Sequence, residues 1–172
     1  MDDEVRRVVD QAAIRDVLYR YARALDRQDW NLLRTCYHPD AIDDHGRFKG
    51  TVEELIEWLK VENGEYDSTT HFIGNTLIEV DGSVAWSEAY CFALHRTHAT
   101  RGEAAREVFN NVRYCDRFER RDGQWRIAAR LVGRDAGRED SVPLEPARTP
   151  HTGRRDGADP SYAVLRLRQP SG

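Results

Sequence analysis

Cysteine is scarce in this sequence. Only three of the 172 residues are cysteines, and they are scattered at Cys36, Cys91 and Cys115. An odd number of scattered cysteines argues against a disulfide framework. The chain also lacks a CxxC motif and paired Cys/His ligand spacing, which argues against a structural zinc site. Buried thiols are the expected role of all three residues.

Long hydrophobic runs are also missing. The apolar stretches are far too short to cross a bilayer. The first residues, MDDEVRRVVDQAA, are acidic and then amphipathic, and they lack the apolar core and cleavage site of a signal peptide. We therefore expect a cytoplasmic protein with no membrane partner.

No part of the chain concentrates charge of one sign. The 26 basic residues are interleaved with 30 acidic ones, the net charge is -4, and no basic run or stripe is present. This distribution excludes the electrostatic footprint of a nucleic-acid-binding protein. The share of apolar residues, 40%, and of charged residues, 33%, is that of an ordinary globular domain, and the length suits one domain.

The first third of the chain has helical periodicity. Apolar residues recur every three to four positions between residues 4 and 27, which predicts one long amphipathic helix. DWNLLRTCY predicts a short helix capped by Asp29. TVEELIEWLKVEN predicts a third helix, in which Thr51 and Glu54 form a capping-box pattern. Between the second and third helices, HPDAIDDHGRFKG is expected to be an irregular connector with a short strand.

From Ser68 the period becomes that of strands. Long alternating runs flank Asp81-Gly82 and Asp122-Gly123, and Asp-Gly between such runs is a strong hairpin signal. Three helices followed by four long antiparallel strands favour an α+β fold, with the N-terminal helices packed on one face of a curved, mainly antiparallel sheet. Such a sheet forms a cone with a pocket between sheet and helices.

The composition changes after Asp135. The remaining residues are rich in proline, glycine and arginine, which is typical of a tail. We expect a domain at residues 1–136 and an extension at 137–172 that packs on the body or on a neighbouring subunit. The candidate anchors of this extension are Tyr162, Val164, Leu165 and Leu167.

Two polar residues lie where the helices should meet the strands. Asp26 comes at the C-terminal end of the first helix, where the helix dipole disfavours a carboxylate. His71 lies near the head of the first long strand, and a strand histidine alone is typical of a structural role. Tyr21 lies on the apolar stripe of the first helix, and its hydroxyl needs a partner if it is buried. Asp26 follows Tyr21 by five positions, so the two do not share an ideal helical face.

Arg130 lies in the alternating run QWRIAARLV. A buried guanidinium would need an acidic or substrate partner, whereas a guanidinium at a subunit interface or in solvent would not. Strict alternation places four residues on each face of this strand: Trp125, Ile127, Ala129 and Leu131 on one, and Arg126, Ala128, Arg130 and Val132 on the other.

The segment HPDAIDDH contains two histidines and three aspartates. Asp-rich turns shaped by proline are common, and nothing in the pattern makes these side chains converge. We therefore expect no metal site at His38, Asp40, Asp43, Asp44 and His45.

Four segments together resemble the SnoaL-like branch of the nuclear transport factor 2-like (NTF2-like) superfamily: AIRDVLYRYARALDRQDW, YHPDAIDDHGRFKG, TTHFIGNTLIEVDG and RYCDRFERRDGQWRIAAR. The resemblance covers roughly residues 5–136, and RDGADPSY in the tail is also similar to this branch. It implies a cone-shaped α+β barrel. The superfamily includes dehydratases, isomerases, polyketide cyclases, dioxygenase small subunits and non-catalytic binding proteins.

Within this branch the sequence most resembles bile acid 7α-dehydratase, hexachlorocyclohexane dehydrochlorinase and scytalone dehydratase. Those enzymes use a His–Asp pair to remove a proton in an elimination. The resemblance places the pair on His71 and Asp26, the arginine of two of these enzymes on Arg130, and a tyrosine on Tyr21. The second histidine of scytalone dehydratase has no match, because His95 and His98 lie toward the far end of their strand; both are left out of the predicted site.

The implied chemistry begins with a neutral imidazole, a good base near neutral pH. Asp26 would fix the tautomer of His71 and stabilise the imidazolium that forms. Tyr21 or Arg130 would hold a carbonyl oxygen or help a hydroxyl leave. The apolar wall around a flat hydrophobic substrate is expected from Trp30, Leu33, Trp58, Phe92 and Phe109, with Asn75 and Asn111 as polar contacts or ordinary strand residues.

We therefore expect a cofactor-independent lyase that acts on a hydrophobic polycyclic, steroid-like or polyketide-like small molecule. An isomerase or polyketide cyclase using the same pocket is the first alternative, since proton abstraction begins both reactions. A non-catalytic ligand-binding protein or a dioxygenase small-subunit-like partner is the second. The resemblance also implies a homo-oligomer, a trimer or a dimer, assembled through the outer face of the sheet.

Overall fold

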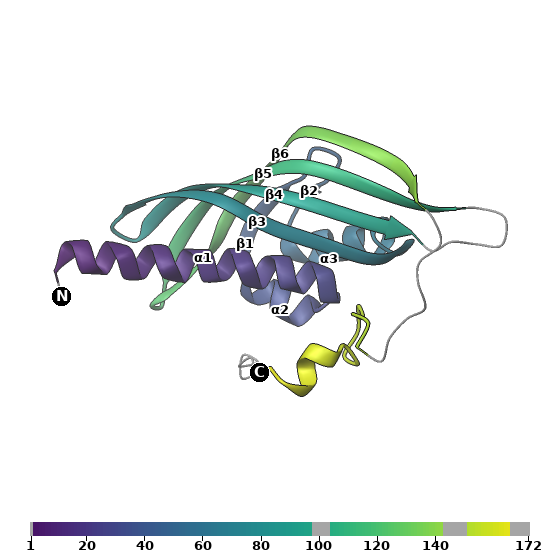
Figure 1. Cartoon of the computed structure of the whole chain (residues 1–172). Helices are drawn as coiled ribbons and strands as arrows, with labels where there is room; N and C mark the ends of the chain where they lie inside the picture. Colours follow the sequence, from purple (N-terminus) through teal and green to yellow (C-terminus); the bar gives the residue numbers. More distant parts are fainter. Residues whose placement is uncertain (1, 98–103, 143–150, 166–172) are drawn as a thin grey trace.

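The computed structural model of the chain describes residues 2–97, 104–142 and 151–165. Three helices, α1 (Asp3–Arg27), α2 (Trp30–Thr35) and α3 (Val52–Glu62), lie on one side of a curved sheet of six strands (Figure 1). The strands are β1 (Tyr37–Asp44), β2 (Lys49–Gly50), β3 (Tyr66–Asp81), β4 (Val84–Thr97), β5 (Ala105–Arg121) and β6 (Gln124–Val142). Their order in the sheet is β2-β1-β6-β5-β4-β3, so the sheet is not closed and β2 and β3 are its edges.

The helices begin and end for local reasons that the sequence predicts. The Asp29 carboxylate accepts a hydrogen bond from the backbone N of Leu32 at 3.0 Å and caps α2. Thr51 and Glu54 form the reciprocal capping box of α3. Gln28 adopts a left-handed conformation with φ 51°, which ends α1 and turns the chain into α2. The three predicted helices are confirmed.

The two hairpins also form where the sequence predicts them. Asp122 and Gly123 have φ values of 50° and 77°, the left-handed pair that a tight hairpin turn requires. Gly82 has φ 57° in the turn between β3 and β4. The structure adds β1, which is longer than expected and pairs in parallel with β6, while all other neighbouring strands are antiparallel. The α+β architecture with a mainly antiparallel sheet is confirmed.

The face of β6 that packs on the helices changes at a bulge. The register with β5 shifts between Arg117 and Phe118, which leaves Ala128 as the extra residue of β6. As a result Trp125, Ile127 and Arg130 are all buried. The prediction that Arg130 and Trp125 lie on opposite faces of the strand is therefore wrong, because strict alternation stops at the bulge.

The change of composition near residue 137 does not mark the end of the sheet. Strand β6 continues past that point to Val142 and stays paired with β5 along this length. The described part of the tail, residues 151–165, contains a short 3-10 helix, η1 (Pro160–Ala163), on the same side of the sheet as the helices (Figure 1). None of the helices in the described residues is both long and apolar enough to span a membrane.

Candidate active site

A histidine and an aspartate meet where the end of α1 packs against β3. His71 Nδ1 lies 2.7 Å from Asp26 Oδ1, and the backbone N of His71 donates to Asp26 Oδ2 at 3.0 Å. Thr69 Oγ1 donates to Asp26 Oδ1 at 3.0 Å. An ionised carboxylate only accepts, so Nδ1 carries the proton and Nε2 is left for proton exchange. The three bonds fix both the position of Asp26 and the tautomer of His71.

A second histidine, His95 of β4, lies next to the pair. Its ring centroid is 5.3 Å from that of His71 in an edge-to-face arrangement, and 5.0 Å from that of Tyr66. Burial, helped by the neighbouring His71, lowers the pKa of His95 to about 4. His95 is therefore a neutral imidazole at pH 7, beside the base, although it was left out of the site expected from sequence.

The His71–Asp26 pair opens into a groove between α1 and the edge strand β3. The groove has a volume of about 370 Å³, and both members of the pair line it. Their side chains are only 6% and 14% exposed, so the pair sits at the bottom of the groove rather than on its rim. The groove is lined by Tyr19, Ala22, Arg23, Asp26 and Arg27 of α1 and by His71, Phe72 and Ile73 of β3.

Arg130 lies in a second buried cluster on the inner face of the sheet. Its Nε and Nη2 donate to the two carboxylate oxygens of Asp116 at 2.7 Å each. The guanidinium lies 4.0 Å from the ring centroid of Tyr21 and 4.2 Å from that of Tyr114. Asp116 is the acidic partner that a buried Arg130 needs. Tyr21 thus belongs to the Arg130 cluster and does not contact Asp26.

Two donors of this cluster have no hydrogen-bond partner among the described residues. They are the hydroxyl of Tyr21 and Nη1 of Arg130, and both are shielded from solvent. Burial raises the pKa of Tyr21, so its hydroxyl stays protonated and able to donate. Cys91 of β4 lies within electrostatic range of both Asp26 and Arg130, and burial raises its pKa to about 11. The inner face of β4 thus links the two clusters.

Small side chains dominate the inner face of β4 between the two clusters. Ala93 is paired with His71 on the adjacent strand β3, and Ala89 is paired with Tyr114 on the adjacent strand β5. Ala89, Cys91 and Ala93 are all buried. The two alanine side chains are much smaller than the rings of His71 and Tyr114, their partners on the two adjacent strands.

The residues expected to form an apolar wall are divided between different places. Leu33 is in the core, and Trp30 packs against it. Trp58 is also partly buried, and its ring stacks on Phe48 at 5.4 Å. Asn75 is exposed, between the residues where the β3–β4 register shifts.

Three of these residues lie on the opposite face of the sheet. Phe92 is 49% exposed, is paired with Asn111, and has its ring 5.6 Å from that of Phe109. The prediction that Phe92, Phe109 and Asn111 line the inner pocket is wrong, because alternation along β4 turns Cys91 and Ala93 inward and Phe92 outward.

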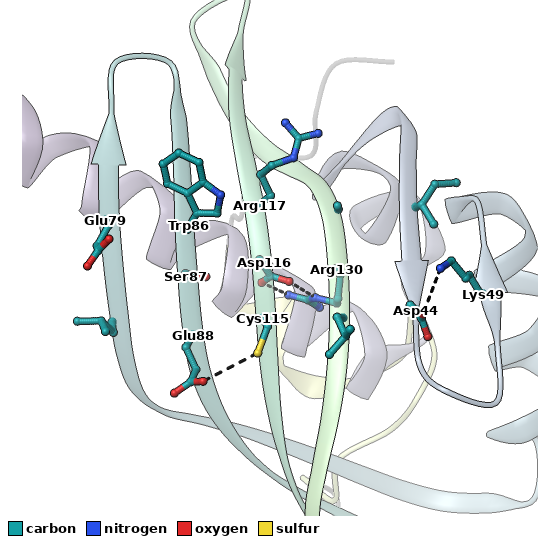
Figure 2. A pocket seen from close by; sticks show the side chains of 14 residues that line it. Asp44, Lys49, Glu79, Trp86, Ser87, Glu88, Cys115, Asp116, Arg117 and Arg130 are labelled. Atoms are coloured by element: carbon teal, nitrogen blue, oxygen red, sulfur yellow. Dashed lines mark hydrogen bonds and ion pairs between the residues drawn. The ribbon is translucent and has the colours of Figure 1, made fainter.

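A larger hollow, of about 650 Å³, lies on this outer face. Figure 2 shows Trp86, Glu88 and Arg117 around it, with the helices behind the strands. Leu77 and Leu131 add exposed apolar surface to the same hollow. It is separated by the sheet from the His71–Asp26 pair, whose residues do not line it.

The acidic residues of HPDAIDDH each have a protein partner. Asp40 pairs with Arg121 at 2.6 Å, and Asp44 with Lys49 at 3.3 Å. Asp43 is buried and accepts from the hydroxyl of Tyr37 at 2.5 Å. It also contacts His45, the second His–Asp contact of the described chain. Among the residues that the structure describes, no three side chains of the metal-binding types form a cluster.

The tail docks on the same end of α1 that carries Asp26. Asp159 forms an ion pair with Arg27 at 3.2 Å. The hydroxyl of Tyr162 lies 3.4 Å from Asp29 Oδ2. Of the other expected anchors, Val164 is 81% exposed and Leu165 is also exposed, whereas Leu167 lies outside the described residues, as does His98. The described contacts of this segment with α1 are an ion pair, hydrogen bonds and the packing of the Arg23 guanidinium on the Tyr162 ring.

The helices packed on a curved, open sheet give the chain the α+β cone of NTF2-like proteins. A family model described as a SnoaL-like domain matches residues 6–131. The chain belongs to this family. The uncharacterized protein Rv2910c of Mycobacterium tuberculosis is 28% identical over 130 residues, which cover 74% of this chain and 86% of that protein.

Solved structures show the same fold at low sequence identity. Hexachlorocyclohexane dehydrochlorinase LinA-type3 from Novosphingobium barchaimii has a TM-score of 0.72 and 17% identity, over 84% of this chain and 99% of the enzyme. The Kfla4162 protein from Kribbella flavida has a TM-score of 0.67 and 19% identity, over 77% of this chain and 95% of that chain. A protein of Novosphingobium aromaticivorans, provisionally named a scytalone dehydratase, has a TM-score of 0.69 and 20% identity, over 83% of this chain and 97% of that chain.

Proposed function

We propose that the chain is a cofactor-independent lyase that removes a proton and a leaving group from a hydrophobic small molecule. The observation that carries this proposal is the 2.7 Å contact between His71 Nδ1 and Asp26 Oδ1 at the bottom of the groove. A histidine held in one tautomer by a buried carboxylate is an effective general base. The dehydratase- and dehydrochlorinase-type structures with the same fold support the assignment.

The reaction we propose is the dehydration of a β-hydroxy carbonyl compound. His71 Nε2 takes the proton on the carbon beside the carbonyl, and the electron pair of that C–H bond becomes the new C=C bond. The C–O bond to the β-hydroxyl breaks, and the leaving oxygen takes the proton from His71 and departs as water. Asp26 stabilises the imidazolium between the two steps. Neutral His95 adds no positive charge that would oppose this protonation.

The carbonyl oxygen gains negative charge in the transition state and needs donors. We assign this role to the hydroxyl of Tyr21 and Nη1 of Arg130, two buried donors of the inner face that lack partners among the described residues. The substrate we propose is a flat polycyclic, steroid-like or polyketide-like molecule that enters from the groove lined by His71 and extends toward these donors.

We also propose that the chain forms a homo-oligomer, a trimer or a dimer, through the outer face of the sheet. Large apolar side chains are exposed there, including Trp86, Phe92 and Leu131, and clusters of this kind mark interaction surfaces. Trp86→Glu should convert the oligomer to a monomer in size-exclusion chromatography with light scattering. A wild-type monomer would overturn this assembly.

The lyase proposal is tested by a turnover screen. The purified protein is incubated with β-hydroxy ketones of steroid and polyketide type, without added metal or nucleotide. Loss of one water is read by mass spectrometry, and the conjugated product by absorbance. His71→Ala and Asp26→Asn should each lower kcat/KM by a factor on the order of a hundred or more. His45→Gln, which removes the other His–Asp contact, is the matched control and should keep turnover.

Two outcomes would contradict the lyase, and a third would contradict the assignment of its base. Product of unchanged mass would identify an isomerase that uses the same base. Tight binding without conversion, unchanged in both variants, would identify a ligand carrier. Turnover that survives in His71→Ala would remove the base from the mechanism.

A further inference from the structure

Arg155 of the tail is fixed at one end of the candidate site. Its Nη1 donates to the backbone oxygens of Asn63 at 2.9 Å and Tyr66 at 2.8 Å. Asn63 ends α3 and Tyr66 begins β3. The guanidinium is therefore anchored to the body through one nitrogen, at the end of β3 that leads to His71.

The other edge of this guanidinium has no hydrogen-bond partner in the part of the chain that the structure describes. Nε and Nη2 of Arg155 are both shielded from solvent and make no hydrogen bond within the described residues. Nearly all buried polar groups of folded proteins are paired, so two unpaired donors on one edge mark a place that suits a ligand. Burial lowers the pKa of Arg155, while the charges of Asp26 and Asp67 raise it.

Other arginines of this chain show which group the Nε–Nη2 edge of a guanidinium binds. Nε and Nη2 present two parallel N–H groups whose spacing matches the two oxygens of a carboxylate. In three ion pairs this edge holds a carboxylate through paired bonds of 2.7 or 2.8 Å: Arg34 with Glu53, Arg113 with Asp135 and Arg130 with Asp116.

A line of contacts connects Arg155 to the catalytic pair. Arg155 bonds the backbone of Tyr66, the ring of Tyr66 lies 5.0 Å from that of His95, and the ring of His95 lies 5.3 Å from that of His71. The positive charge of Arg155 also contributes to the lowered pKa of His95. The guanidinium is thus within electrostatic range of the site.

We propose that Arg155 binds a carboxylate of the substrate, so that the site selects hydrophobic carboxylic acids. Along the sheet, His71 lies between the end where Arg155 is anchored and the end that carries the cluster of Tyr21 and Arg130. One elongated molecule would therefore present its carboxylate to Arg155 and its reacting carbon to His71. The described tail is held by contacts such as the Asp159–Arg27 ion pair at 3.2 Å, and in this proposal it parts from the body to admit the acid. This inference rests on the proposed function, because it takes the bound acid to be the substrate of the lyase.

The test compares the binding of benzoate and benzamide, which share a shape and differ in charge, by isothermal titration calorimetry. The wild type should bind benzoate about tenfold or more tightly than benzamide. Arg155→Gln should abolish this preference. Arg155→Lys, which keeps the charge without the two-donor edge, should retain part of it. Arg154→Gln is the matched control, because Arg154 is exposed and paired with Asp156, and it should keep the full preference.

Equal affinity of the wild type for both compounds, a preference that survives Arg155→Gln, or no detectable binding of benzoate would each overturn the assignment. Thermal unfolding of the variants checks that the domain remains folded. The binding test needs no turnover, so it separates the two proposals. A preference that depends on Arg155 in a protein without lyase activity would support the carboxylate site and contradict the lyase, and the reverse result would do the opposite.

Discussion

Arg130 and Asp116 form a two-bond ion pair in which neither side chain is exposed to solvent. Removing one member leaves an uncompensated charge in the core. Arg130→Met should therefore lower the free energy of unfolding by about 3–5 kcal/mol, measured by urea denaturation. Arg34→Met breaks the exposed pair with Glu53, which has the same two-bond geometry, and should cost about 1 kcal/mol or less.

The double variant Arg130→Met/Asp116→Leu separates charge from packing. It removes both charges together and should recover most of the stability lost in Arg130→Met. A double variant as unstable as the single one would show that packing of the guanidinium on Tyr21 and Tyr114, and not the unpaired charge, dominates the loss.

His95 should make the stability depend on pH. Its pKa is lowered from 6.5 to about 4 in the folded protein, so the unfolded chain takes up this proton at higher pH than the folded one. Stability is then lost as pH falls from 6.5 toward 4, by about 3 kcal/mol in total. Urea denaturation at a series of pH values gives the free energy of unfolding at each pH. Between pH 6.5 and 4 this free energy should fall less steeply in His95→Gln than in the wild type. The exposed His151 is the control, and His151→Gln should keep the slope of the wild type.

The contact between Asp26 and His71 should be visible without any substrate. In the wild type, nitrogen NMR at a pH where the His71 ring is neutral should show its proton on Nδ1, because Asp26 accepts from that atom. In Asp26→Leu the acceptor is gone, and the Nε2-protonated form should become populated. An unchanged tautomer in that variant would contradict the orienting role of Asp26.

The docking of the tail should depend on Asp159. This buried carboxylate accepts from the backbone N of Arg154 at 2.8 Å and of Ser161 at 3.0 Å, and it pairs with Arg27 at 3.2 Å. These contacts hold its pKa down at about 2. Asp159→Ala should therefore release the segment and speed tryptic cleavage at its arginines, while the unfolding of the sheet stays unchanged.

Asp156 provides the matched control for that experiment, since it is exposed and lies in the same segment. Asp156→Ala should be cleaved at nearly the rate of the wild type. Equal cleavage of the Asp159 variant and the wild type would show that other contacts hold the tail.

The sequence was sufficient for the elements whose signals are local. The capping box of Thr51 and Glu54 and the turn at Asp122-Gly123 depend on residues within a few positions of each other, and both form as predicted. The inner position of Arg130 was left open, because the bulge at Ala128 is created by pairing with β5 and leaves no signature in the alternation.

His95 was left out because it lies toward the far end of its strand, and a second register shift brings it to the site. Counting back from the hairpin, without a bulge, pairs His71 with Leu94 and puts His95 on the other face. The shift between Ile73 and Thr76 pairs His71 with Ala93 instead, and Thr69 with His95. His95 then shares the inner face with His71. Arg155 was missed for another reason, since no periodicity connects a tail to the site that it docks against.

The parallel pairing of β1 with β6 has a consequence for how the chain is synthesised. Apart from the two-residue β2, β1 has β6 as its sole neighbour in the sheet, and β6 begins at Gln124. The helices and β1 thus leave the ribosome well before β6, the strand that completes their side of the sheet. Until β6 pairs with β1, apolar residues that are buried in the folded protein, such as Tyr37 and Ala41, are not fully covered. We therefore expect the N-terminal half not to fold on its own, and chains that stop short of Val142 to expose this apolar surface.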